Sequence, residues 1–406
     1  MRHGLIKTLS LLVLGFLARP LSAQELYEPF IAVRPSAVGG AFTAIANDEN
    51  ATWTNPAGIT RIRKARSRRN IDLISAPNLI LGANSKSREF VTVLNSGSSA
   101  GVEQVAAQAD SLGSKPFWAY TGLAPMSFLE VDDVPMIVGL YSANTLSSAL
   151  SAVDSSVADT HVYSDLGVIV GAAYDHPSHR LSLGITTRYM TRYAFEDKIP
   201  LTVLSDPKSL QTAVKNGANK SAAFAYDLGF LWTLADFWFP TFGVAILNGP
   251  TGCKGDYLNP YSKKRERTCG TKYSGSFANA EALSTLDPTD IRVGLSITPR
   301  FGRSFATKIA LDAHHLATMV GGSSYGLQNI AASKKLHAGI EFFTGNPLTP
   351  PPFSIGFGMS QGFYTFGMKT QISKMSLEFA SLGKDISASA GPLEDRRYLG
   401  SLSFMW

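Results

Sequence analysis

The residues best able to do chemistry are charged and imidazole side chains that fall on one face of predicted β-strands. They are Arg188, Arg192, Lys308, Asp312, His314, His337, Glu341 and Glu378. Alternate residues of a strand share a face, so this spacing gathers the side chains on the inner side of a sheet. Groups of these types can bind a metal ion, transfer protons or form ion pairs across neighbouring strands.

Ion pairing is the favoured interpretation, and catalysis or metal binding is the alternative. His314 and His315 suggest a metal site, but adjacent residues of a strand point to opposite faces and cannot easily share an ion. The sequence contains no G-x-S-x-G elbow, no H-E-x-x-H, no Walker loop and no dinucleotide fingerprint. A hydrolase would also need a positioned serine, which the pattern does not supply. We therefore predict no enzymatic activity, no metal and no cofactor.

The elements that position these side chains are long amphipathic strands. Alternation predicts fourteen of them, over 71–83, 117–129, 134–144, 161–175, 179–194, 222–234, 238–248, 290–300, 303–317, 334–344, 352–360, 363–371, 375–384 and 396–406. Most match or exceed the roughly 9–11 residues that cross a bilayer at a tilt, whereas ordinary strands average about five or six residues. An even number of long strands is typical of bacterial outer-membrane barrels.

The links between these strands alternate in length, which distinguishes a barrel from a soluble sandwich. Long links over 84–116, 145–160, 195–221, 249–289 and 318–333 alternate with links of a few residues, and only the short link after the eleventh strand breaks the trend. Outer-membrane barrels have short periplasmic turns and long external loops. We therefore predict an all-β transmembrane antiparallel barrel of about 14 strands over 61–406, with both termini in the periplasm. Its main extracellular loops are 84–116, 195–221 and 249–289.

Composition argues against a helical membrane protein and against nucleic-acid binding. The chain of 406 residues is 45% hydrophobic and 17% charged, and after residue 23 it lacks the run of about 18 apolar residues that a membrane helix needs. The net charge of +6 is partly clustered over 61–69 and 263–267. In an exported protein such clusters are solvated or contact anionic lipid head groups, so we expect no nucleic-acid partner.

Residues 1–23 predict a secretory signal peptide. Arg2 and Lys7 give a positive start, a short apolar run follows, and small residues precede a cleavage point after Ala23. Export favours a disulfide between Cys253 and Cys269, because no nearby histidine completes a zinc site. In the loop over 195–221 we predict a helix that starts at Pro207, with Ser205 or Asp206 as its cap.

The last strand predicts how the barrel is recognised for insertion. Tyr398, Leu402, Phe404 and Trp406 share one face, and the chain finishes on an aromatic residue. An aromatic side chain at the end of a lipid-facing strand is suited to the membrane–water interface. We interpret these residues as the insertion signal, and we expect the barrel-insertion machinery and outer-membrane lipids as partners.

Residues 24–60 carry the most specific local pattern, with paired glycines, small residues and an Asn-Pro-Ala-Gly turn. Its notable positions are Arg34, Gly39, Gly40, Phe42, Asp48, Trp53, Asn55 and Pro56. This string resembles the N-terminal segment of the FadL/PorV-like outer-membrane proteins. The resemblance implies that the segment is a plug, or hatch, inside the barrel, and that the protein lies in the outer membrane of a Gram-negative bacterium.

The resemblance leaves two functions open. FadL-like members imply passive uptake of hydrophobic small molecules, such as long-chain fatty acids. A capture groove would then use apolar loop residues, which could equally be loop packing: Phe90, Val91, Val93, Leu94, Met319, Val320, Leu327 and Ile330. PorV-like members imply instead a platform that binds exported proteins or a secretion or envelope complex without transporting small molecules.

Overall fold

The computed structural model describes residues 28–63, 71–75, 78–87, 116–150, 157–204, 206–259, 264–276, 285–302, 305–320, 325–328, 330–386 and 392–404. The predicted signal peptide, residues 88–115 of the first loop and Trp406 lie outside this part of the chain. No helix among the described residues is long and apolar enough to cross a membrane.

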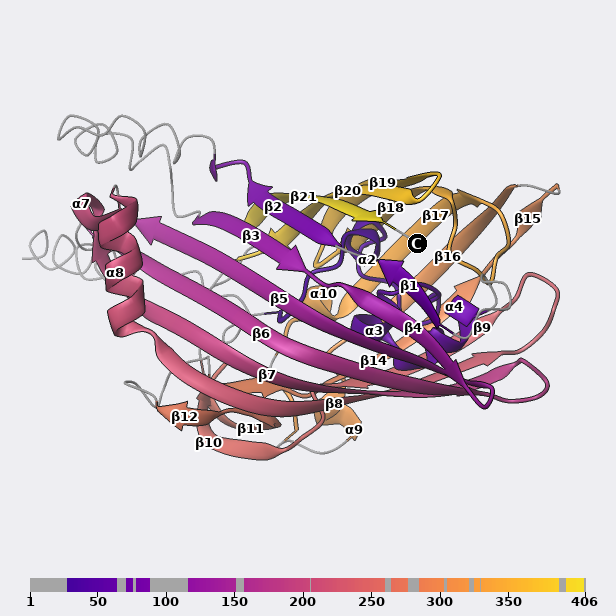
Figure 1. The fold of residues 1–406 in the computed structure, drawn as a ribbon, viewed down its shortest axis with the longest axis horizontal. Coiled ribbons are helices and arrows are strands. Elements are labelled where there is room, and N and C mark those ends of the chain that lie inside the picture. The colour runs from indigo at the N-terminus through magenta and orange to yellow at the C-terminus, as the bar shows by residue number, and fades with distance from the viewer. Residues whose placement is uncertain are drawn as a thin grey trace, which may run out of the picture.

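The strands close into a single antiparallel barrel (Figure 1). They are β1 (Ile71–Ser75), β2 (Leu79–Asn84), β3 (Phe117–Leu123), β4 (Met126–Val131), β5 (Val134–Leu150), β6 (Val157–Asp175), β7 (Leu181–Pro200), β8 (Asn219–Thr233), β9 (Thr241–Leu247), β14 (Asp290–Ile297), β15 (Arg300–Phe301), β16 (Phe305–Ala313), β17 (Leu336–Thr344), β18 (Phe353–Ser360), β19 (Phe363–Ile372), β20 (Met375–Asp385) and β21 (Glu394–Phe404). Closure occurs where β2 pairs with both β3 and β21, with Leu81 opposite Gly400.

Three wall strands are each interrupted once, so these segments make a barrel of fourteen strands as predicted. The interrupted strands are β1 with β2, β3 with β4, and β14 with β15. Pro125 separates β3 from β4, and Pro299 separates β14 from β15. Proline has no backbone N–H to donate to a strand neighbour, so it breaks the hydrogen-bond ladder locally.

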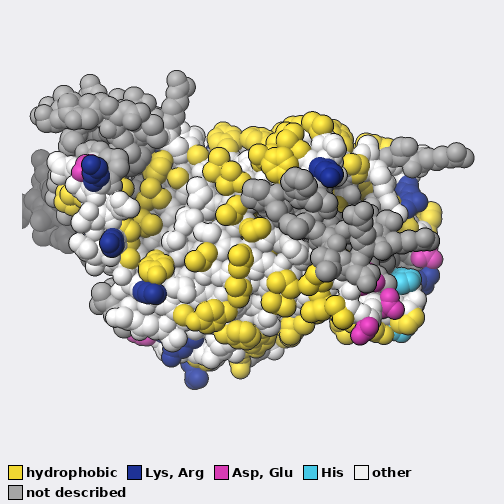
Figure 2. All heavy atoms as spheres, in the orientation of Figure 1, with side chains coloured by type: hydrophobic (Ala, Val, Ile, Leu, Met, Phe, Trp, Pro, Cys, Tyr) yellow, Lys and Arg dark blue, Asp and Glu magenta, His cyan; other side chains and the backbone are white. Residues whose placement is uncertain are grey.

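The wall is apolar outside and polar inside, as strand alternation predicts. On β6, Leu166 and Val168 are exposed whereas Asp165 and Ile169 are buried. Figure 2 shows hydrophobic side chains over the wall, with most of the charged ones toward the two ends. The outward face can therefore meet lipid while the inward face holds the charged groups.

Most short links lie at one end of the barrel, here called the turn end, and most longer links lie at the other, the loop end. The two-residue link over 361–362, between β18 and β19, is a short link at the loop end. The prediction of a long link over 145–160 is wrong. Strands β5 and β6 stay paired through most of this stretch, from the Met136–Ala172 pair to the Leu150–Ala158 pair. The polar, small residues of this stretch resemble a loop, but backbone pairing does not depend on an apolar face. Strand β7 likewise continues to Pro200.

Two structured insertions cover the loop end. Helix α7 (Leu201–Leu204) precedes α8 (Pro207–Gly217), where Asp206 accepts hydrogen bonds from Lys208 N and Ser209 N. The predicted start and cap of this helix are confirmed. The smaller helices α9 (Ala317–Val320) and α10 (Ala332–Lys335) lie between β16 and β17.

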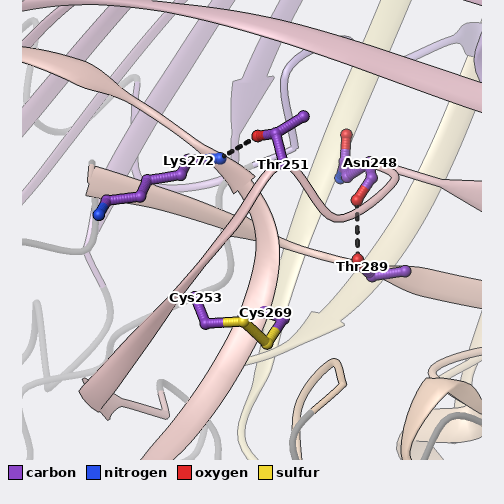
Figure 3. Close-up of a disulfide and its surroundings, with 6 residues drawn as sticks. All are labelled: Asn248, Thr251, Cys253, Cys269, Lys272 and Thr289. Carbon is purple, nitrogen blue, oxygen red and sulfur yellow. Dashed lines mark hydrogen bonds between the residues drawn. A yellow bond between two sulfur atoms is a disulfide. The ribbon is translucent and has the colours of Figure 1, made fainter.

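The second insertion is a small sheet of β10 (Gly252–Leu258), β11 (Arg265–Lys272) and β13 (Leu286–Pro288). The short strand β12 (Ser274–Ser276) pairs with β8 of the wall. The Cys253–Cys269 disulfide joins directly opposite residues of β10 and β11 (Figure 3). At the base of this insertion, Thr289 Oγ1 donates to the Asn248 carbonyl at 2.8 Å. The predicted disulfide is thus present and holds the two strands of this hairpin together.

The N-terminal segment lies inside the barrel (Figure 1). It contains α2 (Val33–Ala37), α3 (Ala51–Thr54), the 3-10 turn η1 (Pro56–Gly58) and α4 (Ile59–Arg63). Residues 28–62 are almost all buried, and we call residues 28–63 the hatch. Such short helices are unstable alone, so their conformation depends on contacts with the wall.

Candidate functional site

The hatch contacts the wall through glycines on both sides. Gly39 and Gly40 have φ angles of +68° and +80°, which favour glycine. A Cβ atom on Gly39 would lie 2.6 Å from the carbonyl oxygens of Ala338 and Met359. The paired glycines therefore allow the hatch backbone to turn directly against β17 and β18.

Wall glycines receive the rest of the hatch in the same way. A Cβ on Gly229 would lie 2.2 Å from Asn55 Oδ1, and one on Gly184 would lie 2.3 Å from the carbonyl carbon of Pro56. Similar close approaches occur at Gly243, Gly339 and Gly358. The sequence shows these glycines, but strand alternation alone gives no sign that they contact the hatch.

Arg34 is the centre of a buried ion-pair network between hatch and wall. Its Nε and Nη2 atoms donate to Glu341 at 2.7 and 2.8 Å, and Nη1 donates to Asn47 at 2.7 Å and Asp48 at 2.5 Å. Burial lowers the pKa of Arg34, but the charges of Glu341 and Asp48 raise it by a larger amount, so the net shift is upward. The guanidinium stays charged and cross-links residues far apart in sequence.

Two wall lysines extend this network. Lys369 Nζ lies 2.9 Å from Glu378 and 3.9 Å from Asp48, and Lys308 Nζ lies 3.9 Å from Glu341. Burial raises the pKa of Asp48, but Arg34 and then Lys369 lower it by more. Of the predicted inward residues, Lys308, Glu341 and Glu378 thus meet in this network of ion pairs.

The Asn-Pro-Ala-Gly turn anchors the other side of the hatch. Asn55 Nδ2 donates to the carbonyls of Thr43 at 2.8 Å and Phe230 at 3.1 Å, and Asn55 Oδ1 accepts from Ala57 N. Phe42 is fully buried, beneath the guanidinium of Arg34 at 5.1 Å. Thr43 and Ala57 belong to the hatch and Phe230 belongs to β8, so Asn55 joins the hatch to the wall.

A second ion-pair network lies nearer the loop end. Arg192 pairs with Asp165 at 2.8 Å and with Asp287 at 2.7 Å, and it lies 4.2 Å from the Tyr273 ring. Because Asp287 belongs to β13, the pair fixes the small sheet against the wall. Asp165 and Asp287 were not predicted as site residues, although Asp165 falls on the inward face of its strand.

Arg188 lies between the two networks, where it pairs with Asp227 at 3.0 Å and donates to Asn248 at 2.8 Å. Its guanidinium lies 5.5 Å from Trp53 of the hatch. Trp53 also stacks on Phe30 at 4.5 Å. Phe30, Trp53 and Arg188 line one side of a cavity next to the hatch.

The cavity has a volume of about 150 Å³ and lies on the loop-end side of the hatch. Part of its lining is apolar, from Phe30, Ile31, Trp53, Leu247 and Leu382. Its polar and charged lining residues include Glu28, Asp290, Arg292, His314, His315, His337 and Lys384. Such a small, half-polar cavity suits a molecule with one apolar ring or short chain and a polar end.

The expectation that His314 and His315 point to opposite sides is wrong. Strand β16 ends at Ala313, and His315 has a φ of +56°, so strand alternation no longer applies. Both residues line the cavity, where the ring of His314 stacks on that of His337 at 3.9 Å. Among the described residues no group of three or more histidine, cysteine or acidic side chains is arranged to hold a metal ion.

The remaining predicted residues fall in different places. Asp312 accepts a hydrogen bond from Thr43 N of the hatch at 2.8 Å. Tyr398, Leu402 and Phe404 lie on β21, away from the cavity. Of the proposed capture residues, Met319 and Val320 are exposed, Leu327 and Ile330 pack with Tyr257 and Leu286, and those over 90–94 lie outside the described residues.

Comparison with solved structures places this arrangement among known barrels. No family model and no curated protein sequence matches the chain. The P. putida toluene transporter TodX matches with a TM-score of 0.52 at 12% identity, over 93% of this chain and 98% of that one. A TodX deltaS2S3 mutant, described as a monoaromatic hydrocarbon channel, matches with a TM-score of 0.54 at 11% identity, over 92% and 98%.

The chain has the fold of these channels. The fold implied by the FadL/PorV-like resemblance is therefore confirmed across nearly the whole length of both chains.

Proposed function

We propose that the chain is an outer-membrane channel for passive uptake of hydrophobic small molecules. The observation that carries this proposal is the partly apolar cavity held between the hatch and the loop end of a closed barrel. The shared fold with proteins described as hydrocarbon channels supports it. We place the loop end at the outer surface of the membrane. A molecule from outside then reaches the cavity before it passes the hatch.

Passage beyond the cavity requires an exit that avoids the hatch or moves it. The interruptions of two neighbouring wall strands favour a sideways route, because the regular ladder stops there. A backbone hydrogen bond from Ala124 N to Asn78 O joins the two strands at this point. Among the described strands, β1 pairs with β4 and has no ladder with β21. Release into the membrane at this weaker part of the wall would leave the ion pairs of the hatch intact.

Uptake of labelled toluene by cells that express the chain tests this proposal directly. Ser36 lines the cavity, so Ser36→Trp should fill the space and reduce uptake to the level of cells without the protein. Ser178→Trp, in an exposed link at the turn end, is the matched control and should transport normally. Equal uptake by both variants would exclude passage through this cavity, and no uptake of either toluene or a long-chain fatty acid by the natural chain would exclude the channel.

The fixed hatch also supports the second function, a platform for exported proteins or an envelope complex. Arg34 makes two hydrogen bonds to Glu341 of the wall and two more within the hatch, to Asn47 and Asp48. A permanently plugged barrel needs no ligand, so Ser36→Trp should leave recovery of a protein complex from solubilised membranes unchanged. Stable co-purification together with absent toluene uptake would favour the platform.

A further inference from the structure

The outward face of β8 carries an exposed lysine just beyond the apolar band of the wall. Lys220 lies at the loop end of this strand, and Phe224, Leu228 and Trp232 follow it on the same exposed face. From Lys220 to Trp232 the strand spans about 40 Å, which is about 30 Å across a membrane at the usual tilt of a barrel strand. The apolar band of such barrels is about 25 Å tall. Lys220 therefore lies at the level of lipid head groups.

A second lysine lies on the same outward face, on the neighbouring strand. Strand β12 pairs with β8, with Ser276 opposite Lys220. Paired residues share a face, and alternation places Lys272 on that face together with Ser276. Lys272 is exposed whereas the residues before and after it are buried. Figure 3 shows its side chain extended away from Thr251.

The positive charge of these lysines is not balanced by the protein. Neither Lys220 nor Lys272 forms an ion pair among the described residues, and Lys220 Nζ lies instead 5.5 Å from the centre of the Tyr193 ring. Asp227, the acid of β8, faces inward and pairs with an arginine inside the barrel. Glu266 of β11 accepts hydrogen bonds within the loop-end insertion. An external anion can therefore approach both lysines without competing with an acid.

The surroundings of the two lysines suit a lipid better than a soluble anion. Tyr193 and Phe224 are 43% and 52% exposed on the outward face, directly beside the lysine positions. Figure 2 shows Lys and Arg side chains at the loop end next to the hydrophobic wall. A lysine at such a boundary lays its methylene chain along apolar surface and keeps its ammonium among the head groups. A lipid contacts the rings and the ammonium groups at once, whereas a soluble anion contacts only the latter.

We propose that Lys220 and Lys272 form a binding site for a phosphate-bearing lipid of the leaflet at the loop end, with its acyl chains against Tyr193 and Phe224. The two lysines lie about 13 Å apart along the strand direction, so one lipid head group reaches both side chains. The site lies outside the barrel, so the inference is independent of the molecule that the barrel carries. An annular lipid held in this way would fix the height of the loop end in the membrane.

Titration of the purified full chain in a non-ionic detergent with bisphosphorylated lipid A, followed by native mass spectrometry, tests the site. Lys220→Gln and Lys272→Gln should each weaken binding about fivefold, the contribution of one cation near an anionic lipid surface. The double variant should lose more than either single one. Lipid A from which a phosphatase has removed the phosphates should bind the natural chain and these variants equally.

Two controls separate a site from general positive charge. Lys374→Gln removes an exposed lysine at the turn end and should leave lipid binding unchanged. Lys220→Arg keeps the charge and should retain the affinity of the natural chain. A loss in Lys374→Gln as large as that in Lys220→Gln would overturn the proposal, and so would equal lipid binding by the natural chain and the double variant.

Inorganic phosphate distinguishes a lipid site from a site for free anions. Millimolar inorganic phosphate should not displace lipid A from the natural chain, because it makes no contact with Tyr193 or Phe224. Displacement by inorganic phosphate, or an equal loss of the phosphate-free lipid in the double variant, would contradict the lipid assignment. All of these comparisons use barrels with changes only at exposed side chains, so the variants should fold as the natural chain does.

Discussion

The hatch contact region and the cavity above it use buried polar groups in opposite ways. Arg34 itself donates through all three of its side-chain nitrogens, and Glu341 accepts two of these hydrogen bonds. Of the described residues that line the cavity, His314 and His337 have Nε2 atoms without a hydrogen-bond partner. Matched buried charges fix a structure, whereas unmatched buried atoms lower stability unless a ligand satisfies them. The difference separates the part that holds the hatch from the part that can bind.

Replacement of Arg34 should lower the free energy of unfolding more than any other change considered. Arg34→Ala leaves Glu341 and Asp48 buried without their main partner, so we expect a loss of about 3–5 kcal/mol in the free energy of unfolding. Denaturant unfolding in detergent, followed by the heat-dependent gel shift of the barrel, measures it. Arg180→Ala removes the exposed pair with Asp236 and should cost no more than about 1 kcal/mol. Equal losses in the two variants would mean that the hatch network does not stabilise the fold.

A methyl group at the glycine contacts should have the next largest effect. Gly229→Ala would place Cβ 2.2 Å from Asn55 Oδ1, so the hatch or the wall must shift. We expect a loss of about 1–3 kcal/mol, as for overpacking of a core. Gly400→Ala is the control in another wall strand, where a Cβ meets no atom within 4 Å. Similar stabilities for the two alanine variants would show that the hatch does not pack closely against the wall at Gly229.

Lys308 is a poorly matched member of the network around Arg34. Its Nζ has no hydrogen-bond partner among the described residues and lies 3.9 Å from Glu341, which keeps both bonds from Arg34. Lys308→Met preserves the side-chain volume and removes a buried charge, so unfolding free energy should change by no more than about 1 kcal/mol in either direction. A loss as large as that of Arg34→Ala would place Lys308 among the essential pairs.

The sequence predicted the barrel because alternation and link length are local signals that repeat along the chain. It also predicted that Lys308, Asp312 and Glu341 face inward, since strand alternation determines the side. It did not predict the partners of Arg34, because Glu341 is 307 residues away. The cavity was missed for another reason. His315 follows the end of β16 with a left-handed backbone, where no periodic pattern applies.

Asp206 offers the smallest and most local contrast with the buried acids of the hatch. Bonds from the Ser209 hydroxyl and from the amides of Lys208 and Ser209 lower the pKa of its exposed carboxyl below the ordinary value of 3.8. A lowered pKa in the folded state stabilises the start of α8 above that ordinary value, and the effect disappears as pH falls through the lowered one.

Hydrogen exchange of the first amides of α8 should therefore be slower at about pH 6 than the intrinsic rate predicts, and this protection should decrease toward about pH 3. Asp206→Asn keeps a capping oxygen but cannot titrate, so its protection should not vary over this range. The unfolding of the whole barrel should be unaffected, because the cap lies at the loop end, outside the ion pairs that hold the hatch. A pH-dependent change in barrel stability that this variant abolished would show that the loop end and the hatch are coupled, contrary to the separation inferred from their hydrogen bonds.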